Sequence, residues 1–293
     1  ITGMFPGVNL KKYLTDLGYG QVEKVIVTDT GLLKKTGELF SAGNLDVLKS
    51  FAIYNLITGT APYLSKNMEQ AVTAFNNAFL GVSSSMSEEE NAFNLLNNVT
   101  GWYLGQMYVE NYFSAEAKHD VEDIVKEIIA TYEKRIRQLD WMTEATKEAA
   151  IAKLRAIKMK IGYPDIWNDP LQGINFKTYA EGGSLLGNIL AITSAQVKYV
   201  KTLLDKPVDK SEWLITPQTV NAYYNATSNE IVFPAGILQA PFYDVNASRE
   251  QNLGGIGSVI AHEITHAFDN NGAQFDKNGN LQNWWQESDY LIF

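Results

Sequence analysis

Apolar residues recur at helical spacing through most of the first half of the chain, which predicts one amphipathic helix after another. The predicted helices span residues 9–17, 45–57, 67–80, 88–113, 120–139 and 143–160, with Gly162-Tyr-Pro164 ending the last one. In the clearest of them an apolar stripe faces a surface of Glu and Lys, which is typical of a helix packed on a core. This stripe consists of Val121, Ile124, Val125, Ile128, Ile129, Tyr132 and Ile136.

The pattern changes in the second half, where β-branched and aromatic residues gather in short runs. Residues 219–234 predict a β-hairpin with its turn at 225–229. A Gly-rich stretch then leads into an apolar helix, and residues 283–290 begin a further helix. In the first half, residues 24–28 fit either a brief strand or a connector. Residues 83–90 predict a loop whose Ser caps the helix after it.

Length and composition narrow the class of protein. A chain of 293 residues can form one large or two ordinary domains, and 45% hydrophobic with 19% charged residues is typical of a globular protein. The formal net charge of −9 argues against nucleic acid or an anionic membrane as the main partner. No apolar run approaches the length of a membrane span. The chain has no cysteine, so any metal must be held by His and carboxylate groups.

The candidate chemistry lies in His262-Glu263-Ile-Thr-His266, the H-E-x-x-H pattern of zinc hydrolases. On a helix the two imidazoles project from one face, one turn apart, so both can hold a single ion at about 2.0–2.1 Å. Glu263 would lie beside that face, close enough to take a proton from a zinc-bound water whose pKa is lowered to about 7. The pattern therefore predicts a metal site with an adjacent general base.

The pattern also occurs by chance, as two surface histidines beside a solvated glutamate. Its surroundings favour the metal site, because the segment is apolar on most sides and so predicts a buried helix. Burying two His and a Glu without a shared partner would cost several kcal/mol. The third histidine, His119, lies beside Asp120 at a predicted helix start, where a solvated or capping role is favoured.

The hairpin, the glycines at 254–257, the His motif and Trp284-Trp285 together resemble the neprilysin family of zinc metallopeptidases, which includes bacterial endopeptidases. The most specific blocks are residues 220–225, 229–238, 254–257, 262–269 and 274–285, and the stretches 139–147 and 157–164 resemble the helical domain of that family. The resemblance therefore extends over nearly the whole chain.

The resemblance implies a mainly α fold. A large helical domain, residues 1–180, would cover the active site, and residues 181–293 would begin an incomplete α+β, thermolysin-like zinc-protease domain. The implied reaction is the hydrolysis of peptide bonds in oligopeptides. His262 and His266 would bind one zinc ion, and Glu263 would act as general base on the zinc-activated water.

Three more residues acquire expected roles from the resemblance. Asn221 and Ala222 would lie on the strand that hydrogen-bonds the substrate main chain, as an exposed strand edge can. A plain turn or strand-end role for Asn221 stays open. Asp269 follows His266 by about one helical turn, near enough to orient its ring, although a loop acid without such a role is a close alternative.

One departure from the family is large. The third zinc ligand of the family is a glutamate in a Glu-Asn-Ile-Ala-Asp motif, and neither this motif nor the later transition-state residues occur in the sequence. We expect an internal piece of a longer enzyme, missing N- and C-terminal parts, with the third ligand beyond Phe293 and no activity by itself. Glu287 is a tempting substitute, but the resemblance places its helix away from the metal.

A different class of protein stays open beside the peptidase. A metal-free binding or scaffold module, or a pseudo-enzyme of the same fold, would retain the same helices and hairpin. Zinc content measured together with peptide hydrolysis separates the two hypotheses. The absence of cysteine favours a bacterial source, cytoplasmic or extracytoplasmic, and leaves the compartment undetermined.

Overall fold

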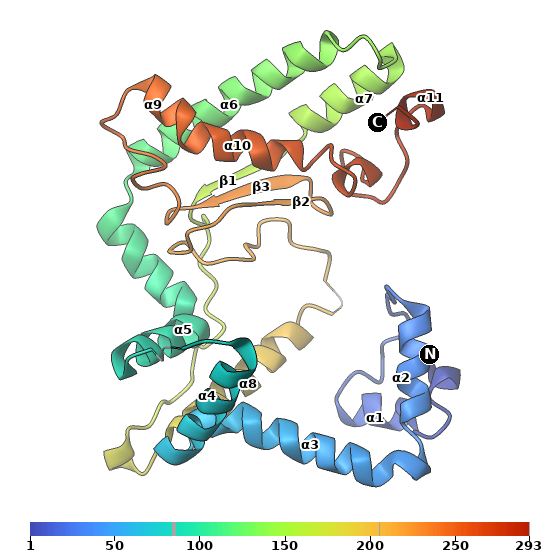
Figure 1. The fold of residues 1–293 in the computed structure, drawn as a ribbon, viewed down its shortest axis with the longest axis vertical. Helices are drawn as coiled ribbons and strands as arrows, with labels where there is room; N and C mark the ends of the chain where they lie inside the picture. Colours follow the sequence, from blue (N-terminus) through green and yellow to red (C-terminus); the bar gives the residue numbers. More distant parts are fainter. Residues whose placement is uncertain (84–85, 205, 293) are drawn as a thin grey trace. The chain divides into compact units, whose positions relative to one another are not determined.

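A computed structural model describes residues 1–83, 86–204 and 206–292, and it is mainly α-helical (Figure 1). The chain divides into two compact units, Ile1–Met86 with Asn175–Thr193, and Ser87–Ile174 with Ser194–Phe293. This division differs from the boundary expected at residue 180, because residues 87–174 pack with the C-terminal part of the chain. Compact units of this kind need not coincide with the domains of an enzyme, so the predicted domains, residues 1–180 and 181–293, stay a prediction. Among the described residues, no helix combines the length and apolarity that crossing a bilayer requires.

The first unit is built, in its described residues, from helices alone, apart from its turns and connecting segments. They are α1 (Leu10–Asp16), α2 (Thr30–Leu39), α3 (Leu45–Thr60), α4 (Lys66–Leu80) and the first part of α8 (Leu185–Lys201). The sequence pattern predicted α1, α3 and α4, and it missed α2 and α8. A cap signal could have revealed α2, since the Asp29 carboxylate accepts the N–H of Leu32 at 2.8 Å. Residues 24–28 form no strand and are a connector.

The second unit contains helices of very different lengths, from 4 residues in α11 to 25 in α5. They are α5 (Glu88–Tyr112), α6 (Ala115–Arg137), α7 (Glu144–Arg155), α9 (Arg249–Gly254), α10 (Ile256–Thr265) and α11 (Glu287–Tyr290). The predicted Ser cap is confirmed, because Ser87 and Glu90 form a reciprocal capping box at the start of α5. Positions 84 and 85 of the predicted loop lie outside the described residues.

A three-stranded sheet of order β1-β3-β2 lies in this unit. The predicted hairpin is confirmed as β2 (Tyr223–Asn225) antiparallel to β3 (Glu230–Pro234). The predicted helix 143–160 is wrong beyond Arg155, because α7 ends there and Lys158–Gly162 form β1, parallel to β3. The backbone partners of β1 come from a segment far along the chain, which a local periodicity cannot reveal.

The core of the second unit lies between the sheet and two helices, with α10 crossing one face of the sheet and packing against α6 (Figure 1). The predicted stripe of α6 is confirmed, since Val121, Ile124 and Val125 are fully buried and the rest of the stripe packs against the same core. Tyr132 of α6 also fixes α10 directly: its hydroxyl donates to the carbonyl of Ala261 at 2.9 Å. The position of α10 is therefore set by both neighbours.

Candidate metal centre

Helix α10 positions the His motif through one apolar face. Ile256, Ile260 and Ile264 on this face are fully buried, so the opposite side of the helix turns outward. His262 is exposed and His266 is half-buried. The helix is thus buried on one face only, whereas the sequence predicted burial on most sides. This arrangement leaves both imidazoles accessible from solvent.

The two imidazoles meet as their spacing predicts. The Nε2 atoms of His262 and His266 lie 3.0 Å apart, with the ring planes at 87°. Glu263 completes a cluster in which one possible ligand atom of each residue lies within 4.8 Å of the others. Glu263 as a residue is only 7% exposed, so a largely buried carboxyl group lies beside two ring nitrogens.

Asp269 lies against the outer nitrogen of His266. Its Oδ2 is 2.6 Å from Nδ1 of the ring, while its Oδ1 accepts the N–H groups of Asn271 at 2.9 Å and Gly272 at 2.8 Å. Burial alone would raise the pKa of Asp269, but these N–H groups and the His266 ring hold it below its usual range. An ionised Asp269 places the ring proton on Nδ1, which leaves the lone pair of Nε2 for the cluster.

The pKa of Glu263 is shifted in the opposite direction. Burial raises it, because the charged carboxylate loses solvation, while the two imidazoles and the backbone N–H of Tyr224 partly offset that effect. Tyr224 belongs to β2, so the hairpin contributes to the surroundings of this carboxylate. A carboxylate with a raised pKa is a better proton acceptor than one in water.

The donor set fits zinc. Two nitrogens on one tetrahedral zinc at about 2.0–2.1 Å would lie about 3.3 Å apart, close to the 3.0 Å between the Nε2 atoms. Across the described residues, the groups able to hold a metal reduce to this cluster, and Glu287 is not a member. Glu287 is exposed on α11. His119 is exposed within α6, 3.7 Å from Glu122, which agrees with the solvated role predicted for it.

The residues predicted to bind substrate lie next to the hairpin. Asn221 is exposed and Ala222 is buried, and both immediately precede β2. The Oδ1 of Asn221 accepts the N–H of Ala222 at 2.9 Å. Strand β2 is at the edge of the sheet and contacts α10. Among the described residues the outer edge of β2 pairs with no further strand, so an open strand edge lies near the His helix.

Sequence reasoning missed Lys153, a buried residue of α7. Its ammonium donates to the carbonyls of Ala267, Gly272 and Phe275, in the segment that follows the His motif. A local signal existed, because Lys153 lies one turn after Ala150 on the apolar face of its helix. A lysine at a core-facing position needs partners, and the pattern alone cannot say which.

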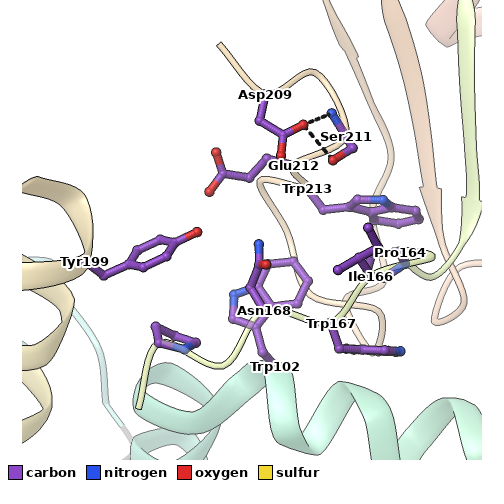
Figure 2. A pocket seen from close by; sticks show the side chains of 11 residues that line it. Trp102, Pro164, Ile166, Trp167, Asn168, Tyr199, Asp209, Ser211, Glu212 and Trp213 are labelled. Atoms are coloured by element: carbon purple, nitrogen blue, oxygen red, sulfur yellow. Dashed lines mark hydrogen bonds between the residues drawn. The ribbon is translucent and has the colours of Figure 1, made fainter. Parts of the chain in front are cut away.

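An aromatic pocket of about 130 Å³ lies elsewhere in the second unit (Figure 2). Its aromatic lining comes from Trp102, Tyr199, Trp167 and Trp213, and Asp209 and Glu212 also line it. The carboxylate of Asp209 is engaged by Ser211, through its N–H at 2.8 Å and its hydroxyl at 2.6 Å. None of the lining residues belongs to the His-Glu-His cluster, so this pocket is separate from the candidate metal centre.

Comparison with known proteins agrees with this fold and cluster. Two models of peptidase family M13 match the chain, one over residues 1–164 and the other over residues 221–293. The chain belongs to peptidase family M13, and the resemblance inferred from its motifs is confirmed.

Individual relatives are considerably longer than this chain. A neutral endopeptidase of Lactobacillus helveticus is 39% identical over 289 residues, which cover 99% of this chain and 44% of that protein. The crystal structure of PEPO from Lactobacillus rhamnosis matches with a TM-score of 0.85 and 30% identity, over 100% of this chain and 48% of that one. The crystal structure of a Mycobacterium tuberculosis zinc metalloprotease in complex with an inhibitor matches with a TM-score of 0.78 and 38% identity. This match covers 89% of the present chain and 38% of the other. The chain thus spans less than half the length of each.

Proposed function

We propose that this chain carries part of the active site of a zinc-dependent endopeptidase that hydrolyses peptide bonds in oligopeptides. The observation that supports this most is the pair of Nε2 atoms of His262 and His266, 3.0 Å apart beside the buried Glu263. The two imidazoles would hold one zinc ion. Bound there, zinc supplies Lewis acidity and lowers the pKa of water to about 7.

Glu263 is the general base of this proposal. Its raised pKa suits a group that takes a proton from the attacking water and later gives it to the leaving amine. The Tyr224 N–H and the fully buried neighbour Ile264 limit the freedom of this carboxylate. Asp269 acts through His266, whose Nδ1–H it accepts, and so would keep the Nε2 lone pair free to hold a zinc ion.

The edge of β2 is the proposed place of the substrate main chain. An extended peptide can add to an unpaired strand edge through backbone hydrogen bonds. Asn221 and Ala222 lead into this strand, so their polar groups would bind the peptide beside the cluster. A third zinc ligand from outside the printed sequence is part of the proposal, since the cluster holds no carboxylate besides Glu263 among the described residues.

The test compares the intact protein with Glu263→Gln for zinc content and for hydrolysis of an unstructured oligopeptide. We expect about one zinc per chain in both and hydrolysis by the wild type alone. A wild-type protein that binds no zinc and cleaves nothing would instead be a binding or scaffold module of this fold.

A further inference from the structure

Lys153 is among the largest fully buried side chains of the described residues, at 1% exposure. Its Nζ donates to three main-chain carbonyls, those of Ala267 at 2.7 Å, Gly272 at 2.6 Å and Phe275 at 2.7 Å. An ammonium has three N–H donors, so each of them has an acceptor. The three carbonyls therefore satisfy all the hydrogen-bond donors of the buried ammonium.

Along the chain, the three carbonyls lie on either side of Asp269, whose carboxylate contacts His266. Ala267 directly follows His266, and Gly272 also donates its N–H to Asp269. The chain folds back closely here: a Cβ on Gly272 would lie 1.8 Å from the carbonyl oxygen of His266. Lys153 therefore fixes the main chain on both sides of Asp269.

The main chain of Lys153 is connected to the Glu263 side of the His-Glu-His cluster by a series of hydrogen bonds. Its carbonyl accepts the side-chain amide of Asn229 at 3.1 Å, and this amide also donates to the carbonyl of Lys277 at 3.1 Å. The Oδ1 of Asn229 accepts the hydroxyl of Tyr224 at 2.9 Å. The backbone N–H of Tyr224 in turn lies beside Glu263. One residue of α7 is thus linked to both the His266 and the Glu263 sides.

If position 153 served only to fill the core, an uncharged aliphatic side chain would be sufficient. Burial lowers the pKa of Lys153 to about 8, which reflects the cost of removing an ammonium from water. Phe268 and Trp284 contribute rings at 5.8 and 5.6 Å from Nζ, surroundings that would also accommodate an aliphatic side chain. The hydrogen bonds to the three carbonyls therefore explain why a charged group occupies this buried position.

We propose that Lys153 is a positioning residue of the metal centre. By fixing the turn from residue 267 to 275, it holds Asp269 on Nδ1 of His266 and so directs Nε2 toward the ion. This inference rests on the proposed function for its catalytic consequence, while its effect on the His266 ring and on metal affinity does not require catalysis.

The test replaces Lys153 with Met, which keeps the length and removes the donors, in the intact protein. Lys147→Met is the matched control, because Lys147 is a buried lysine of the same helix whose Nζ bonds Arg137 and Glu144 instead. We expect Lys153→Met to weaken zinc binding about 10- to 100-fold and to lower kcat more than it raises KM. Lys147→Met should leave zinc affinity within about twofold of the wild type, whatever it does to the melting temperature.

A double-mutant cycle separates positioning from general stability. If Lys153 acts through Asp269, Lys153→Met combined with Asp269→Asn should weaken zinc binding clearly less than the product of the single effects. The ring proton of His266 in the metal-free protein, followed by NMR, should exchange faster in Lys153→Met and remain unchanged in Lys147→Met. If Lys153→Met does not fold, Lys153→Gln, whose amide can still donate to two carbonyls, takes its place.

Independent, multiplicative effects in the cycle would overturn the proposal, as would a folded Lys153 variant with wild-type zinc affinity and an unchanged His266 signal. Failure of the proposed function looks different. The wild type would then cleave no peptide. The shift of the His266 resonance in the metal-free protein would still follow Lys153, and so would the shift in zinc affinity if the wild type binds zinc.

Discussion

The Oδ2 of Asp269 lies 2.6 Å from Nδ1 of His266, while its Oδ1 accepts two backbone N–H groups of the following turn. The carboxylate is therefore held by the main chain at the same time as it holds the ring. Such a contact selects the tautomer of the imidazole and its orientation before an ion binds. The candidate metal centre is in this sense preorganised by a residue that is not one of its proposed ligands.

Replacing Asp269 with Asn should weaken zinc binding about 10- to 100-fold, because the amide no longer favours a proton on Nδ1. Competition with a chelator measures the affinity. Asp276→Asn is a suitable control, since Asp276 caps a nearby turn through the N–H groups of Asn278 and Asn280. Equal zinc affinities for Asp269→Asn and wild type would show that this contact does not orient the ligand.

Changing Glu263 to Gln should leave zinc binding nearly intact and reduce turnover by orders of magnitude, because it removes the base and retains both imidazoles. Zinc stoichiometry and single-turnover peptide hydrolysis measure the two properties separately. Turnover within about tenfold of the wild type would contradict the role of Glu263.

Asn221→Ala should raise KM and slow cleavage without releasing zinc, because a hydrogen bond to the substrate main chain is lost. Kinetics with a series of oligopeptides measure the change. Asn221 also accepts the N–H of Ala222 within the chain. A lower melting temperature with unchanged kinetics would therefore mean that its role is structural only.

Glu287→Gln should leave zinc affinity unchanged, since Glu287 is exposed on α11 and is not a member of the His-Glu-His cluster. The same chelator competition provides the measurement. A tenfold or greater loss would identify Glu287 as a ligand and would contradict the proposed ligand set.

Asp289 provides a pH-dependent contribution to stability. Burial alone would raise its pKa, but the hydroxyls of Thr143 and Thr146 and the N–H of Thr143 hold it below its usual range. A carboxyl with a lowered folded-state pKa stabilises the fold above its unfolded pKa of about 3.9, and this contribution is lost as the pH falls through the folded pKa. Asp289→Asn should therefore unfold at lower denaturant concentration than wild type at neutral pH. The gap should narrow as the pH falls below the unfolded pKa of about 3.9.

The sequence by itself determined that His262 and His266 lie together, because their relation depends only on the local geometry of one helix. Spacing along one helix is enough to place His262 and His266 on the same face, and the short runs around residues 225–229 are enough to predict a hairpin. The amphipathic stripe of α6 likewise follows from its period alone. These features depend on neighbours within a few residues, which a sequence pattern records directly.

Only the tertiary structure decided the features whose partners lie far apart along the chain. Lys158–Gly162 became a strand because β3 supplied its backbone partners, although the preceding residues continue a helical pattern. Lys153 became a centre of hydrogen bonding because the turn after His266 brought three carbonyls to its ammonium. No periodicity encodes such a meeting, since it depends on how α7, the hairpin and the turn after α10 pack together.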